Sequence, residues 1–137
     1  MPETILSEEV AQEQINVFMD YYDIDLDALD EDTRKIVDGS LKTIKRGVMK
    51  GVIEITTDEG LSITQTLKRP PEKTSGDLKY KVATGKARAI MNEKSGPHEK
   101  CYQLIGFLTG LGDRAIKSLE IVDLKYCEAF GALFLSV

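Results

Sequence analysis

The spacing of apolar residues changes twice along this chain, and the two changes restrict the fold class more than any other feature. Over residues 7–48 apolar residues recur at the spacing of a helix with one buried face. Over residues 51–67 they alternate with polar residues, which is typical of strands. Beyond residue 97 the helical spacing returns. A chain of 137 residues can bury one core without metal or disulfides, so this order predicts an α+β domain.

Two helices that form an antiparallel hairpin are expected at the start of the chain. Ser7 is suited to cap the first helix, over about residues 7–22, because its hydroxyl can accept from a backbone N–H of the first turn. Asp30 is suited to cap the second helix in the same way. Residues 23–29 form the connection. Residues 1–48 are therefore expected to form a helical hairpin that is acidic at its start and basic at its end.

A β-hairpin is expected over about residues 51–67. Its turn signal is the run Asp58-Glu59-Gly60, which lies between two stretches of alternating apolar and polar residues. Pro70 and Pro71 end the hairpin, because proline has no backbone N–H to donate to a neighbouring strand. The composition of residues 68–77 then predicts a loop.

The next segment, residues 78–92, fits two patterns. Apolar residues alternate over 78–82, as they do in a strand, whereas Ala83 to Met91 suit a helix. We favour the helical interpretation, with a helix that begins near Thr74–Asp77.

A C-terminal bundle of three to four helices is expected to complete the chain. Pro97 suits the first turn of a helix that is apolar on almost all sides over residues 101–111, so this helix is expected at the centre of the fold. Asp113 is suited to cap a short helix, and Asp123 is suited to cap the last one. Residues 49–137 would then hold the β-hairpin and the helical bundle, packed with the N-terminal hairpin as one compact unit.

Charge is distributed unevenly along the chain. Residues 1–32 contain 11 Asp or Glu and no Lys or Arg, whereas residues 33–100 contain 15 Lys or Arg and 8 Asp or Glu. The acidic segment can cover the basic one or meet a basic partner, and ordinary solvated surface is the plain alternative. The first helix also carries apolar side chains, so we expect it to dock on its own chain or on a second copy. Association of two or more copies of the chain, as a homo-oligomer, is therefore one of the two alternatives.

The acidic connection between the first two helices starts like a calcium loop but does not complete one. Asp23, Asp25 and Asp27 have the opening spacing of such a loop. Ala28 stands where the loop needs glycine to turn, and Arg34 stands where it needs a bidentate acid. The segment is therefore interpreted as an acidic connection between helices.

Other motifs for chemistry are also incomplete. The run 84–86 ends like a phosphate-binding loop, but Tyr80 replaces the required first glycine and Ala87 replaces the hydroxyl residue that would hold magnesium. His98 and Cys101 lie three residues apart on a predicted helix. Two side chains alone do not make a nucleophilic centre, which needs a third, orienting group, or a zinc site, which needs more ligands. We therefore expect no catalytic, cofactor-binding or metal-ligating residues and no cofactor, and the chain is not expected to be an enzyme.

Nucleic acid is not expected as a partner. The run Lys79-Tyr80-Lys81 places one aromatic residue between two lysines, and its ring could form a small stacking platform for a nucleotide. The acidic N-terminal segment and the sequence pI near 5.0 argue against this interpretation.

The sequence also suggests a cytoplasmic location. Residues 1–5 lead directly into acidic residues and show no signal peptide. The longest strongly apolar stretch, residues 129–137, is too short to cross a bilayer, so no membrane is expected as a partner. Cys101 and Cys127 lie in apolar helical patterns, and two buried thiols in a reducing compartment are favoured over a disulfide.

Short motifs in the C-terminal two thirds occur in a characteristic order. The β-hairpin ends in Leu67-Lys68-Arg69-Pro70 and is followed by the polar run Thr74-Ser75-Gly76-Asp77-Leu78. An apolar helix then ends in Thr109-Gly110-Leu111, and the chain closes with Phe130, Phe134 and Leu135. In this order the motifs resemble the tail assembly chaperone family of long-tailed bacteriophages, over about residues 51–135. Residues 1–48 match no pattern of that family.

The resemblance implies a cytoplasmic, non-catalytic helper made during phage or prophage growth. Proteins of that family bind the long, helical tape measure protein, keep it from aggregating and help tail-tube subunits assemble around it. Two alternatives stay open, namely a structural subunit of a phage tail or tail-like particle and a small nucleic-acid-binding regulator. As partner-binding residues we consider Phe18 and Tyr21 on the first helix, and Phe134 and Leu135 at the end of the last one.

Overall fold

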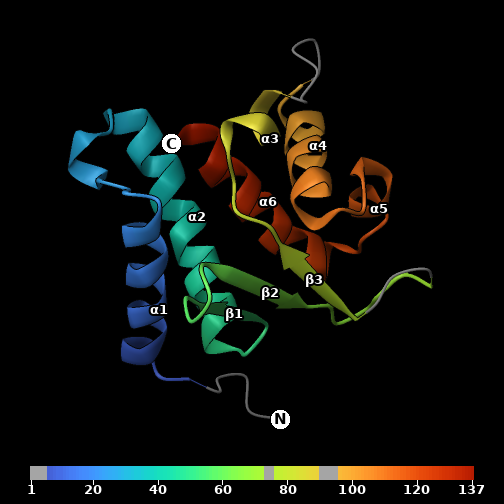
Figure 1. Cartoon of the computed structure of the whole chain (residues 1–137), viewed down its shortest axis with the longest axis horizontal. Helices are drawn as coiled ribbons and strands as arrows, with labels where there is room; N and C mark the ends of the chain where they lie inside the picture. The colour runs from blue at the N-terminus through green and yellow to red at the C-terminus, as the bar shows by residue number, and fades with distance from the viewer. Residues whose placement is uncertain (1–5, 73–75, 90–95) are drawn as a thin grey trace.

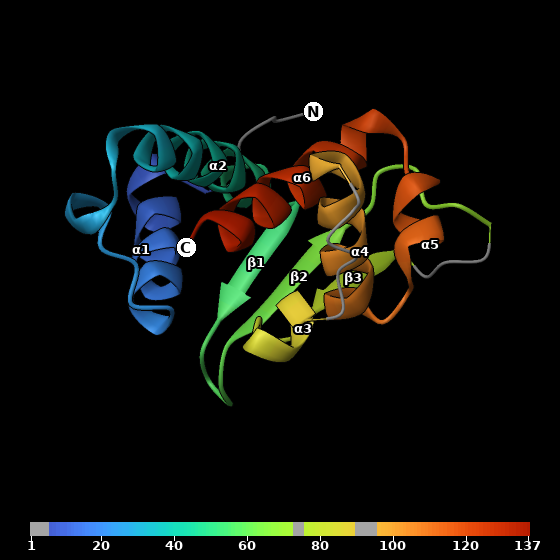
Figure 2. The same cartoon turned by 90° about the horizontal axis from the view of Figure 1, so that it is seen from above.

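The computed structural model describes residues 6–72, 76–89 and 96–137. Helices surround one buried face of a three-stranded antiparallel sheet, which confirms the α+β class (Figures 1 and 2). The elements in chain order are α1 (Glu8–Tyr21), the 3₁₀ helix η1 (Leu26–Ala28), α2 (Glu31–Met49), β1 (Ile53–Thr56), β2 (Ser62–Thr66), β3 (Asp77–Tyr80), α3 (Gly85–Ala89), α4 (Pro97–Thr109), α5 (Asp113–Lys117) and α6 (Ile121–Ser136).

The N-terminal helices α1 and α2 form the antiparallel hairpin that the sequence predicts (Figure 1). The Ser7 hydroxyl accepts from the backbone N–H of Val10 at 3.2 Å, and the Asp30 carboxylate accepts from that of Thr33 at 2.8 Å. Both caps therefore stand where the sequence places them. Helix α1 packs on α2 and on β1, so the expected docking of the acidic segment takes place on its own chain.

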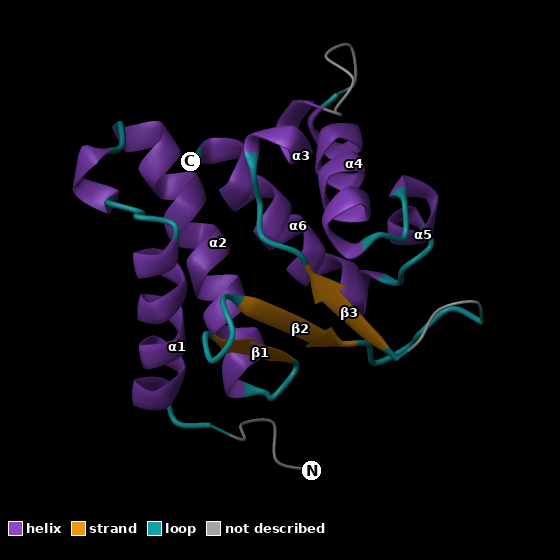
Figure 3. Ribbon diagram, viewed as in Figure 1, coloured by secondary structure: helices purple, strands orange, loops and turns teal. Residues whose placement is uncertain are grey.

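The sheet has a third strand beyond the predicted hairpin (Figure 3). Strand β2 pairs with β1 on one side and with β3 on the other, and Gln65 lies opposite Leu78 in the second pair. The prediction of a helix that begins near Thr74–Asp77 is wrong for Asp77, which starts β3, while Thr74 lies outside the described residues. Pairing with β2 satisfies backbone groups that a two-stranded hairpin would leave open, and this outweighs local helix preference.

Side chains of the sheet alternate between a buried face and an exposed face. The inward residues come from all three strands and are Ile53, Ile55, Ile63, Gln65, Leu78 and Tyr80. Helix α6 lies across this face between α2 and α4 (Figures 1 and 2). The ring of Phe130 on α6 lies 4.8 Å from the ring of Tyr80, measured between centroids. The last helix therefore occupies the centre of the fold, beside the predicted central helix α4 with its buried Ile105.

Two predicted caps of the C-terminal helices are wrong. Helix α5 begins at Asp113 itself with Gly112 at its N-cap, and α6 begins at Ile121 with Glu120 at its N-cap, so neither Asp is the cap that the sequence suggested. Asp123 instead lies in the first turn of α6 at 1% exposure. Its carboxylate accepts from the backbone N–H groups of Lys68 at 2.8 Å and Arg69 at 3.0 Å. Asp123 thus fastens the segment after β2 to α6.

One hydrophobic core joins the N-terminal hairpin to the rest of the chain. Phe18 of α1 is fully buried, and its ring centroid lies 6.0 Å from those of both Phe130 and Phe134 on α6. The two units that the sequence suggests, residues 1–48 and 49–137, therefore share their interior. Aromatic pairs at such distances in tilted geometry add to the burial of their apolar area.

Candidate functional site

The four residues predicted to bind a partner fall into two groups. Phe18 is 0% exposed and Phe134 is 4% exposed, so both side chains belong to the core of this structure. Each faces the interior between α1 and α6, because the acidic first helix docks there. Tyr21 is 46% exposed, and Leu135 is partly buried against the core. Only Tyr21 therefore keeps a largely open side chain.

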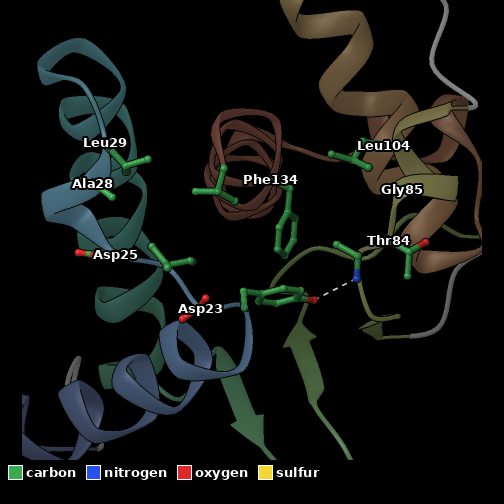
Figure 4. A pocket seen from close by; sticks show the side chains of 12 residues that line it. Asp23, Asp25, Ala28, Leu29, Thr84, Gly85, Leu104 and Phe134 are labelled. Carbon is green, nitrogen blue, oxygen red and sulfur yellow. Dashed lines mark hydrogen bonds between the residues drawn. The ribbon is translucent and has the colours of Figure 1, made fainter.

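An open apolar pocket lies at the C-terminal end of α6 (Figure 4). Its volume is about 420 Å³, and most of its surface is apolar. We call it the Tyr22 groove, and its lining comes from three parts of the chain: Tyr22, Asp23, Ile24, Asp25, Ala28 and Leu29 after α1, Ala83, Thr84 and Gly85 after β3, and Leu104, Phe134 and Val137 of α4 and α6. Figure 4 shows Ala28 and Leu29 on one side of the end of α6, with Thr84 and Leu104 on the other.

Tyr22 holds the first two parts of the groove together. Its phenolic oxygen accepts a hydrogen bond of 3.0 Å from the backbone N–H of Ala83 (Figure 4). Its ring lies 5.3 Å from those of both Phe18 and Phe134, in edge-to-face geometry. Burial raises the pKa of Tyr22 above its ordinary value, although the N–H of Ala83 acts in the opposite direction. The hydroxyl is therefore neutral at physiological pH.

The rim of the groove owes its shape to an irregular turn after α1. Asp23 has a φ of 53°, which is the left-handed region that Asp and Asn tolerate better than most residues. The next residue, Ile24, donates its N–H to the carbonyl of Met19 at 2.9 Å, and this bond closes the end of the helix. Asp25 then caps η1 by accepting from the N–H of Asp27 at 3.0 Å. The turn thereby places exposed carboxylates beside an apolar surface.

The part of the rim that follows α1 is negatively charged. Asp23 and Asp25 are exposed, and within the described ranges no Lys or Arg nitrogen lies within 4.0 Å of either carboxylate. The nearby Asp27 does have a partner, Arg34, at 3.6 Å. Helix α6 also ends at the groove, and the C-terminal end of a helix carries a partial negative charge. Both effects favour a cation at this rim.

The groups that could support catalysis are buried, scattered or already bonded. Burial raises the pKa of Cys101 and of Cys127 to about 12, so both free thiols are protonated and poor nucleophiles. Both are buried, as the sequence predicts. His98 lies on the surface, where its Nδ1 is 3.8 Å from Glu128 Oε2. Among the described residues there is no group of three or more His, Cys, Asp or Glu side chains that could hold a metal ion.

The possible stacking platform for nucleic acid is also closed. Tyr80 is buried between the sheet and α6, and its hydroxyl donates to Gln65 Oε1 at 2.8 Å. A base cannot reach its ring in this structure. In the part of the chain that the structure describes, no helix has the length and the apolar run needed to cross a bilayer.

The residues that form the groove could not all be recognised from the sequence. Asp23 and Asp25 were visible there, but only as an incomplete calcium loop, and Thr84 and Gly85 only as an incomplete phosphate loop. The missed residue is Tyr22, which follows Tyr21 directly. A pair of aromatic residues at the end of an amphipathic helix was a weak signal, because nothing local shows which ring turns inward.

A scan against family models found no match, and searches among curated proteins and among solved structures found none either.

Proposed function

We propose that this chain is a non-catalytic, protein-binding assembly chaperone of a long-tailed phage or prophage, which acts in the host cytoplasm on the tape measure protein. The single observation that carries the proposal is the Tyr22 groove, an open apolar surface assembled from three parts of the chain. The order of motifs over residues 51–135 supplies the choice of partner. A chaperone needs an accessible apolar surface, because it must shield the apolar face of a client.

The chemistry of the groove favours a protein over a small molecule. Small-molecule sites surround their ligand and offer several convergent polar groups that fix its orientation. Here the hydroxyl of Tyr22 is already bonded to Ala83, and the exposed carboxylates of Asp23 and Asp25 lie on the acidic connection after α1. An apolar surface with a charged rim is the usual composition of a protein interface.

The direct test is co-expression with the tape measure protein of the phage or prophage whose genome encodes the chain. We expect the tape measure protein to precipitate when expressed alone and to remain in solution with the chain, in a complex whose mass light scattering can measure. The matched control is an unrelated acidic protein of similar size. If the tape measure protein has the same solubility with and without the chain, and no complex elutes, the proposal is wrong.

The composition of purified particles distinguishes the chaperone role from the main alternative, a structural tail subunit. A chaperone is released during assembly, so quantitative mass spectrometry of particles should find the tube subunits and not this chain. A fixed number of copies per particle would instead establish the structural role. The two results exclude one another, and the measurement does not depend on the groove.

A further inference from the structure

We infer that the Tyr22 groove binds a basic amphipathic helix of the partner, which inserts a large apolar side chain and places Lys or Arg beside Asp23 and Asp25. This inference rests on the proposed function and names the chemistry of the segment that is bound. The occupant is a protein. Acidic helices, nucleic acid and anionic membranes are disfavoured by the same negative charge.

The apolar half of the site is preformed. The side chains of Leu104 and Phe134 are fixed by the core, and Val137 closes the end of α6. The hydrogen bond from Ala83 to Tyr22 holds two adjoining walls together before any partner binds. Since the site does not have to be assembled on binding, the entropy cost of ordering the protein is small, and an inserted side chain binds more tightly.

The acidic half supplies the charge complementarity. Residues 20–32 contain seven Asp or Glu and no Lys or Arg. Two of these acids, Asp23 and Asp25, line the groove itself, and the C-terminal end of α6 adds partial negative charge there. Within the described ranges neither carboxylate has a Lys or Arg partner at ion-pair distance. A cation of the occupant can therefore meet them without displacing an internal ion pair.

A helix meets both halves of the site with one short segment. Residues three or four apart lie next to each other on a helix surface, so an apolar side chain and a Lys one turn away can enter one pocket together. The apolar lining and the two carboxylates belong to the same groove, so one such segment can contact both. An extended segment would turn successive side chains to opposite sides, and only alternate ones could reach the groove.

The test uses two designed peptides of about four helical turns, one of Leu and Lys with opposed apolar and basic faces, the other with Glu in place of every Lys. We expect the Lys peptide to bind the full chain at least tenfold more tightly than the Glu peptide in calorimetry at low salt. Physiological salt should reduce the difference, because exposed charges are screened over about 8–10 Å. Equal binding of both peptides would overturn the inference.

The double variant Asp23→Asn with Asp25→Asn tests the rim. Asn tolerates the left-handed backbone at residue 23 and can cap η1 at residue 25, so the fold should be retained. We expect the Lys peptide to bind about three- to tenfold more weakly, in line with two exposed ion pairs. The control, Glu9→Gln with Glu13→Gln, removes the same charge from exposed positions of α1 outside the groove and should change affinity less than about twofold.

Amide spectra recorded during titration locate the peptide. Shifts are expected at the lining residues 22–29, 83–85, 104 and 134–137, and shifts confined to other parts of the chain would contradict the inference. The outcomes also separate this inference from the proposed function. If the tape measure protein binds the wild-type chain and the double variant equally, the basic-helix inference fails and the chaperone proposal stands. If the Lys peptide binds in the groove while the tape measure protein does not bind, the reverse holds.

Discussion

The phenolic oxygen of Tyr22 accepts a hydrogen bond of 3.0 Å from the backbone N–H of Ala83, and this bond connects the end of α1 to the segment after β3. The two residues are 61 positions apart in the chain, yet together they form adjoining walls of one apolar groove. The acidic first helix is therefore part of the candidate binding site as well as of the core.

Removal of this hydrogen bond should weaken the fold locally. Tyr22→Phe keeps the ring contacts with Phe18 and Phe134 but leaves the N–H of Ala83 without its acceptor. We expect a loss of about 1 kcal/mol in the free energy of unfolding, measured by urea denaturation. Tyr21→Phe, at an exposed neighbour, is the matched control and should cost less than about 0.5 kcal/mol. Equal losses in both variants would show that the bond contributes nothing.

The buried face of α4 should be intolerant of truncation. Leu108 is 0% exposed, so Leu108→Ala should cost about 2–5 kcal/mol because it removes apolar contacts and leaves a cavity. Leu111, just beyond the same helix, is 42% exposed, and Leu111→Ala should cost less than about 1 kcal/mol. Urea denaturation of both variants makes the comparison. A loss under about 1 kcal/mol for Leu108→Ala would contradict the burial of this face of α4.

The carboxylate of Asp123 should matter more than its exposed neighbour. Asp123→Ala leaves the N–H groups of Lys68 and Arg69 without their acceptor and should cost about 3 kcal/mol. Glu120→Ala breaks only the surface ion pair with Arg69 and should cost less than about 1 kcal/mol. Thermal unfolding of the two variants is the measurement. The reverse order of the two losses is incompatible with the anchoring role of Asp123.

The buried thiols predict a loss of stability in alkali. Burial raises the pKa of Cys101 and Cys127 from 9.0 to about 12, so above pH 9 the unfolded chain releases protons that the folded chain retains. The contribution of the thiols to the free energy of unfolding is therefore fully present below pH 9. It falls as the pH rises toward 12, by up to about 1.4 kcal/mol per pH unit for each thiol. Denaturant melts of the double variant Cys101→Ala, Cys127→Ala should show a shallower decline. An unchanged slope would contradict the raised pKa values.

The sequence predicted the features that depend on neighbouring residues. The caps at Ser7 and Asp30, the start of α4 at Pro97 and the turn between β1 and β2 are all present. Each of these is determined within about four residues, by a side chain that satisfies nearby backbone groups or by a favourable backbone angle. Local chemistry alone is therefore sufficient to place them.

Features that depend on distant residues were missed or misassigned. Strand β3 forms because β2 offers it an edge, and the alternation of Leu78 and Tyr80 is too short to decide against a helix. The role of Asp123 depends on Lys68 and Arg69, more than fifty positions away in the chain. Phe18 has the same local pattern whether it meets a partner or its own core. The Tyr22 groove, assembled from three separate segments, could not be inferred from any one of them.

Hydrogen exchange of the chain with and without the tape measure protein tests the central claim, protein binding through the Tyr22 groove, most directly. We predict slower exchange for the amides of residues 22–29 and 83–85 and for the last turn of α6 when the partner is present. The polar face of the sheet, with half-buried Thr64 and exposed Lys79, should be unchanged and serves as the internal control. Protection of the sheet face with an unchanged groove, or no change anywhere in the chain, would contradict the account.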